Sequence, residues 1–123
     1  MNGNNVVLDT NIILYLLQGD AVLQDFLKEK DFTLSFINEL ELLGFRKITP
    51  NEEHSLRYFL DECAILDINQ GIKDITVQLR RKYSLKLPDA IICATAIFLG
   101  IPLLSADRHF GQIEELLFVL YQP

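Results

Sequence analysis

Four acidic residues stand where a carboxylate could do chemistry. Asp9 lies in VVLDTNIILYLL, Glu41 in SFINELELLGF, Asp89 in KLPDAIICATA and Asp107 in PLLSADRHF. Carboxylates that converge repel one another and raise each other's pKa values, and a divalent cation removes that cost. Because hard oxygen ligands favour Mg²⁺, Mn²⁺ or Ca²⁺ over Zn²⁺, the four acids predict a metal site if the fold brings them together.

Each of these acids also has a plainer interpretation. Asp9 and Asp107 follow apolar runs and could cap the helix or turn that comes next. Asp89 directly follows a proline, and an acid in the first turn of a helix is favoured by the helix dipole. Asn38 and Glu41 could form a capping box. Each alternative remains open when it is taken alone. Taken together, they require four separate elements to place an acid at the same edge of the sheet by chance.

The direction of Glu41 depends on the helix expected around it. Glu39 and Glu41 are about 200° apart on a helix, so they face opposite ways. Glu39 shares a face with Arg46, which marks the solvent side. We therefore expect Glu41 to point towards the body of the protein, where a carboxylate is costly unless it is paired or bound to metal.

Strand and helix patterns alternate along the chain, which predicts an α/β fold with a parallel sheet covered on both faces. Sites in such sheets form outside the carboxyl ends of the strands, where Asp9 and Asp107 are expected. The predicted strands cover residues 6–8, 32–35, 63–68, 101–105 and 116–121, and the predicted helices cover residues 10–17, 21–30, 38–47, 51–62, 71–83 and 88–99.

Length and composition predict one globular domain over residues 1–123, of which 50% are hydrophobic. No apolar stretch reaches the roughly 20 residues that a membrane span needs, and no secretory signal is visible. Cys63 and Cys93 make no zinc pattern with the two histidines and are expected to be buried thiols. We therefore expect a cytoplasmic protein without membrane attachment.

A net charge of −6 argues against a nucleic-acid partner, because phosphate backbones favour basic surfaces. The objection weakens if bound cations offset part of the charge. A basic cluster leading towards Asp89 could guide phosphate groups, or could be a solvated helix end. The cluster contains Arg80, Arg81, Lys82 and Lys86.

The segments LDTNIIL, NELELLG, KLPDAIICATA and LLSADRHF resemble, in order and spacing, the four signature segments of PIN domains. They are most similar to those of the VapC-type toxin nucleases of toxin–antitoxin pairs. The resemblance implies a single PIN-like nuclease domain, a three-layer α/β/α sandwich with a short, mainly parallel sheet. It also implies that one or two Mg²⁺ or Mn²⁺ ions are bound by acids matching Asp9, Glu41, Asp89 and Asp107, with Asn11 and Ser105 in support.

The function expected from the residues and the resemblance together is metal-dependent hydrolysis of RNA. The resemblance adds the role of toxin in a toxin–antitoxin pair, with a cognate antitoxin as partner. Two alternatives remain: an inactive PIN-fold binding module and, less favoured, an aspartate-based phosphotransfer domain. We also expect a homodimer, since the first helix has little polar surface across Leu14, Tyr15, Leu16 and Leu17.

Overall fold

The computed structural model describes residues 4–123. Residues 1–3, part of the stretch in which no secretory signal was expected, lie outside the described residues. The strands are β1 (Asn5–Leu8), β2 (Asp31–Ser35), β3 (Ala64–Leu66), β4 (Leu103–Ser105) and β5 (Phe118–Leu120). The helices are α1 (Thr10–Leu17), α2 (Ala21–Leu27), α3 (Phe36–Leu43), α4 (Pro50–Asp61), α5 (Gln70–Lys82) and α6 (Leu87–Leu99), followed by the short 3₁₀ helix η1 (Arg108–Gln112).

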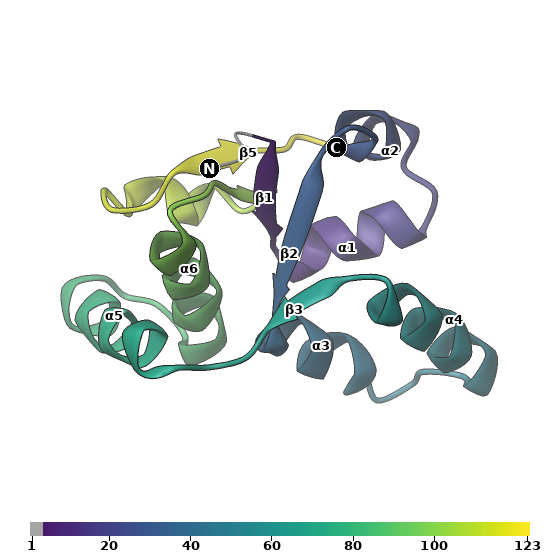
Figure 1. The fold of residues 1–123 in the computed structure, drawn as a ribbon, viewed down its shortest axis with the longest axis horizontal. Helices are drawn as coiled ribbons and strands as arrows, with labels where there is room; N and C mark the ends of the chain where they lie inside the picture. Colours follow the sequence, from purple (N-terminus) through teal and green to yellow (C-terminus); the bar gives the residue numbers. More distant parts are fainter. Residues whose placement is uncertain (1–3) are drawn as a thin grey trace.

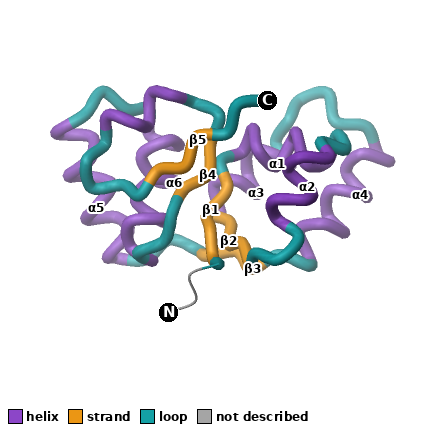
Figure 2. Tube along the Cα trace, turned by 90° about the horizontal axis from the view of Figure 1, so that it is seen from above, coloured by secondary structure: helices purple, strands orange, loops and turns teal. Residues whose placement is uncertain are grey.

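The five strands form one sheet in the order β3-β2-β1-β4-β5, and every neighbouring pair is parallel. Helices therefore have to cross over the sheet between strands, and they bury both of its faces. Figure 2 shows the sheet between two groups of helices. The predicted three-layer α/β/α architecture with a parallel sheet is confirmed.

Successive side chains of β1 enter opposite cores. Val7 packs with α5 and α6 in one apolar cluster, whereas Val6 and Leu8 pack with α1 to α4 in the other. The same division is visible in Figure 1, where α5 and α6 lie on one side of the strands and α1, α2 and α4 on the other. Because β1 and β4 are adjacent and parallel, the residues just beyond their carboxyl ends lie at the same edge of the sheet.

Several element boundaries differ from the prediction. Ser35 caps α3 and, with Asn38 at the third helical position, forms a capping box, so α3 begins at Phe36 and ends before Gly44. The helix predicted over residues 38–47 was therefore misplaced. The helix predicted over residues 21–30 ends at Leu27, because β2 already begins a few residues later.

Helix α6 carries one acid at its mouth. It begins at Leu87, which puts Pro88 at the second position rather than the first, and Asp89 falls in its first turn. Gly100 ends the helix with φ 69°, a left-handed conformation that favours glycine. Within residues 4–123, no helix has both the length and the apolar character that crossing a membrane requires.

Candidate active site

Asp9 is a buried carboxylate at the carboxyl end of β1, with 7% of its surface exposed. Its Oδ1 accepts a hydrogen bond from the Thr10 backbone N–H at 2.9 Å, which caps α1 as the plainer interpretation proposed. Its Oδ2 accepts a second hydrogen bond from the Ser105 hydroxyl at 2.7 Å, which reaches across from β4. Burial raises the pKa of Asp9 above its ordinary value of 3.8, and the charges of Asp89 and Glu41 add to that rise.

Asp89 lies half-buried in the first turn of α6, and no side-chain hydrogen bond caps that helix. Burial is the largest cause that raises the pKa of Asp89 above 3.8, and the negative charges of Glu41 and Asp107 raise it further. Lys86 and His109 oppose the rise. Asp89 is thus close enough to two other acids for their charges to act on it, although these acids come from different elements.

Glu41 is exposed, whereas Glu39 is partly buried, so the expected burial of Glu41 was wrong. The inference failed because Arg46, which marked the solvent face, lies beyond the end of α3 and shares no helical face with Glu39. The capping box with Asn38 is excluded too, since Asn38 itself occupies the third position. Glu41 nevertheless turns towards α1, where its Oε1 accepts a hydrogen bond of 2.6 Å from the Thr10 hydroxyl.

Asp107 is exposed and caps η1, with its Oδ1 accepting a hydrogen bond from the His109 backbone N–H at 2.9 Å. Its own N–H donates to the Ser105 hydroxyl at 3.0 Å. The fully buried Ser105 hydroxyl therefore joins the backbone of Asp107 to the carboxylate of Asp9. Ser105 is one of the two residues that we expected to support the site, and its two hydrogen bonds place it between two of the four acids.

We call the four acids the acid group, because the charges of Asp89 and Glu41 act on Asp9 and those of Glu41 and Asp107 act on Asp89. The thiol of Cys93, one helical turn after Asp89 and fully buried, has its pKa raised first by burial and then by Asp89, Asp9 and Asp107. All four acids supply hard oxygen donors of the kind that Mg²⁺ and Mn²⁺ prefer. Within residues 4–123, however, no three acidic, histidine or cysteine side chains are placed as a metal-holding group. The acids therefore lie near one another without surrounding a single metal position.

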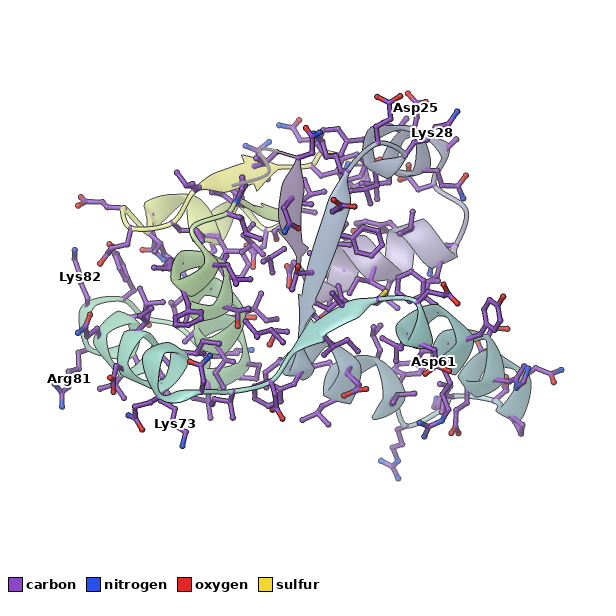
Figure 3. All side chains as sticks on the ribbon, in the orientation of Figure 1. Asp25, Lys28, Asp61, Lys73, Arg81 and Lys82 are labelled. Carbon is purple, nitrogen blue, oxygen red and sulfur yellow. The ribbon has the colours of Figure 1, made fainter. Side chains whose placement is uncertain are left out.

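The predicted basic cluster divides in the structure. Lys86 is the residue before α6 and acts electrostatically on Asp89. Lys82 instead pairs with Glu115 at 3.3 Å, and Arg81 and Lys82 project from the outer end of α5 in Figure 3. Asn11, the other expected supporting residue, is exposed on α1.

Two residues at the site were not predicted to belong to it: Thr10, and Asn38, which was considered only as a capping partner of Glu41. Thr10 bonds Glu41, and the side chain of Asn38 bonds Thr10 at 3.0 Å. Asn38 could have been suspected, since it is a polar residue on the apolar side of α3, one helical turn before the buried Leu42. Thr10 carries no such signal, because a residue next to a helix cap is exposed in most proteins.

An apolar groove of about 570 Å³ adjoins the acids. It lies between α1, α3 and α4, and Thr10 and Glu41 line one part of it. Leu14, Leu17 and Phe45 are its exposed apolar side chains. The groove therefore places an uncovered apolar surface beside one of the candidate site residues.

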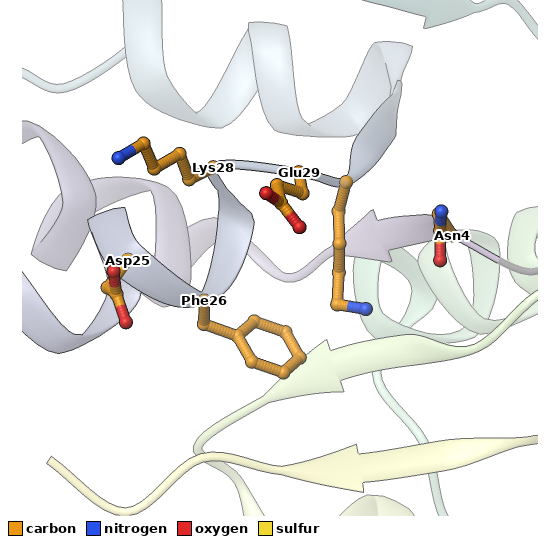
Figure 4. A pocket seen from close by; sticks show the side chains of 6 residues that line it. Asn4, Asp25, Phe26, Lys28 and Glu29 are labelled. Carbon is orange, nitrogen blue, oxygen red and sulfur yellow. The ribbon is translucent and has the colours of Figure 1, made fainter.

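A second hollow lies away from the acids. Figure 4 shows the side chains that line it, Phe26 among them. Lys30 Nζ stands 4.9 Å from the centre of the Phe26 ring. Asn4 and Lys30 precede β1 and β2, so this hollow belongs to the amino edge of the parallel sheet. It is not part of the acid group.

Comparison with known proteins places this geometry in a family. The PIN domain model matches residues 6–116. A chain of a toxin–antitoxin complex from Klebsiella pneumoniae is 32% identical, with a TM-score of 0.82 over 96% of this chain and 99% of that chain. A search of curated proteins found no match.

Two further solved structures share the fold at lower identity. A chain from a VapBC complex of Rickettsia felis bound to a promoter DNA fragment is 21% identical, with a TM-score of 0.82 over 96% of this chain and 99% of that one. A chain of VapBC-1 from nontypeable Haemophilus influenzae is 22% identical, with a TM-score of 0.79 over 94% and 97%. With a family match across most of its length and this shared fold, the chain belongs to the PIN-domain family.

Proposed function

We propose that this chain is a Mg²⁺- or Mn²⁺-dependent endoribonuclease that hydrolyses RNA phosphodiester bonds as the toxin of a toxin–antitoxin pair. The observation that carries the proposal is the group of four acids from separate elements, in which Asp9 is buried and Asp89 half-buried at a cost that a cation would relieve. Asp9, Asp89 and Glu41 would hold the metal, and Asp107 would bind it or a coordinated water.

A divalent ion held there would supply an activated water and neutralise charge on the phosphate. The chain's own residues do the rest. Ser105 and the Thr10 backbone N–H keep both oxygens of Asp9 oriented. Lys86, exposed beside Asp89, offers a positive charge to an incoming phosphate. The sheet and α6 keep solvent from one side of the acids, which strengthens their interaction with a cation.

The alternatives are weaker. An aspartate-based phosphotransfer domain would use Asp9 as its nucleophile, and a phospho-aspartate trapped at that residue would decide in its favour. An inactive binding module would have no need to gather acids that repel one another. That alternative is decided by the cleavage experiment.

The test is cleavage of a mixed-sequence fluorescent RNA with Mg²⁺, with Mn²⁺ and with EDTA. We expect cleavage with either metal, none with EDTA, and none for Asp89→Asn with either metal. The matched control is Asp61→Asn, an exposed acid at the end of α4 (Figure 3), which should cleave like the wild type. A wild-type protein that binds the RNA but leaves it intact with both metals would support the inactive module instead.

The partner is inferred from the solved neighbours and the groove. Those neighbours come from toxin–antitoxin complexes, and an apolar segment of an antitoxin would bury Leu14, Leu17 and Phe45 beside Glu41. Such a partner is expected to block the site. Leu17→Glu should abolish binding of a co-expressed antitoxin and leave RNA cleavage unchanged; retained binding would contradict this use of the groove.

The homodimer stays a prediction. Of the four apolar residues on which it rested, Leu14 and Leu17 are exposed, whereas Tyr15 and Leu16 pack against a core cluster. Light scattering at micromolar concentration should show a species of twice 14.1 kDa, and a species of 14.1 kDa alone would refute it. The cytoplasm remains the proposed compartment, which suits two unpaired cysteines.

A further inference from the structure

Asn38 is a fully buried polar side chain in the first turn of α3. Its Oδ1 accepts a hydrogen bond of 2.8 Å from the Ser35 backbone N–H. Its Nδ2 donates a hydrogen bond of 3.0 Å to the Thr10 hydroxyl on α1. Because the Ser35 N–H can only donate, the amide oxygen of Asn38 must face it, and the amide nitrogen must face Thr10.

The direction of the next hydrogen bond follows from the first two. The Thr10 hydroxyl has one hydrogen, and its oxygen already accepts from Asn38. That hydrogen is therefore left for Glu41 Oε1, which lies 2.6 Å away. The three hydrogen bonds run one way, from the Ser35 backbone through Asn38 and Thr10 to Glu41, and aligned bonds of this kind polarise and strengthen one another.

We propose that Asn38 and Thr10 are positioning residues that hold the Glu41 carboxylate at the acid group. Glu41 is exposed, so packing alone does not fix its side chain, whereas the relay begins at a fully buried amide. The relay uses Oε1 and leaves the second carboxylate oxygen outside it. The role of Glu41 as a ligand rests on the proposed function; the relay itself does not.

A purely structural link between α1 and α3 is the competing explanation. The two helices already meet through the apolar core that contains Ile12, Ile13 and Leu42, so they do not depend on the hydroxyl to stay together. A structural link would change the melting temperature without changing the state of the Glu41 carboxylate. The position of that carboxylate is therefore the quantity to measure.

The first experiment is carbon NMR of the Glu41 carboxyl in the full, metal-free chain. Thr10→Val keeps the shape and removes the hydroxyl, and it should move the Glu41 signal towards that of a freely solvated glutamate. Thr10→Ser should restore the wild-type signal. The matched control is Thr76→Val, whose buried hydroxyl bonds only the Ile72 carbonyl of its own helix, and it should leave the signal unchanged. An unchanged signal in Thr10→Val would overturn the relay.

The second experiment is calorimetric titration with Mn²⁺ alone, combined with kinetics of RNA cleavage. Residues that orient a metal ligand typically change affinity about 10- to 100-fold when they are mutated. We expect Thr10→Val to weaken Mn²⁺ binding about tenfold and to lower kcat with KM unchanged, and Thr10→Ser to recover both. Wild-type Mn²⁺ affinity in Thr10→Val would overturn the positioning role.

Asn38→Asp gives an independent variant that does not touch Glu41. It keeps the oxygen that accepts from Ser35 and removes the donor to Thr10, so the Glu41 signal should move as it does in Thr10→Val. If this variant does not fold, Thr10→Val alone decides. If the wild type neither binds Mn²⁺ nor cleaves RNA, the proposed function fails, and the metal-free NMR still decides the relay.

Discussion

The candidate site consists of an exposed pair of acids and a second pair, called the buried pair, in which Asp9 is buried and Asp89 half-buried. Asp9 and Asp89 lie against the sheet and α6, and burial is the largest cause of their raised pKa values. Glu41 and Asp107 are exposed at the rim. The buried pair therefore carries an electrostatic cost in the folded state, whereas the exposed pair needs hydrogen bonds to stay in place.

The hydrogen bonds of the four acids differ between the two pairs as well. Asp107 caps η1 with its own oxygen, and Glu41 is reached by the relay from Asn38. Asp9 has Ser105 and the start of α1 around it, but its charge remains unfavourable without a cation. Substitutions that remove charge from the buried pair should make the metal-free fold more stable. Substitutions that remove hydrogen bonds should leave the acids less well oriented.

The largest effect is expected for Asp9→Asn. Asparagine caps a helix about as well as aspartate, so α1 should keep its start. Removal of the charge should leave the metal-free protein more stable than the wild type. RNA cleavage should fall more than about 100-fold, beyond the usual cost of changing a residue around a ligand. Melting curves with and without Mg²⁺ should show that the variant loses most of the metal-dependent stabilisation. Full metal-dependent cleavage by the variant would remove Asp9 from the site.

Ser105→Ala should come next in size. The hydroxyl donates to Asp9 and accepts from the Asp107 N–H, and Ser105 is fully buried. The buried Oδ2 of Asp9 would lose its donor, which costs about 1–3 kcal/mol, so the free energy of unfolding should fall by about that amount. Cleavage should drop about 10- to 100-fold. Ser55→Ala, an exposed control on α4, should change neither quantity, and equal behaviour of the two variants would mean that Ser105 orients nothing.

A smaller effect concerns pH and isolates the charge of Asp9. In EDTA at neutral pH, Asp9→Asn should melt above the wild type. The folded-state pKa of Asp9 lies above its ordinary value of 3.8, so the folded chain takes up the proton more readily than the unfolded chain. Stability from this group is therefore gained as the pH falls through the folded-state pKa. The gap between the two melting temperatures should narrow as the pH falls from neutral towards the ordinary value of 3.8, and a constant gap would show that burial of charge is not its cause.

The fold could be predicted because its signals are local. Apolar strand runs alternate with helical patterns, and a parallel sheet places its strand ends at one edge. The placement of Asp9 and Asp107 after β1 and β4 followed from that rule alone. Asp89 was located by the proline and the apolar helix behind it, although its helix starts one residue earlier than expected.

The rest could not be predicted because it depends on contacts between distant segments. Asn38 and Thr10 are 28 residues apart, and nothing in either segment specifies the other. The expected burial of Glu41 was wrong because α3 ends at Leu43, before the residue used to mark the solvent side. Hydrogen-bond partners across a fold are set by packing, so local pattern reasoning does not reach them.

The smallest effect separates two basic residues that sequence reasoning placed in one cluster. Lys86 lies beside the buried pair, where its charge acts on Asp89, whereas Arg81 projects from the outer end of α5 (Figure 3). Both side chains are exposed, so neither substitution should affect folding much. If Lys86 meets a substrate phosphate, Lys86→Ala should raise KM for RNA on the order of 3-fold at low salt, and the difference should shrink as salt screens the charge. Arg81→Ala should leave KM unchanged at every salt concentration. Equal changes of KM in both variants would mean that RNA responds to the overall charge of this surface. A charge at the site would then have the same effect as a charge away from it.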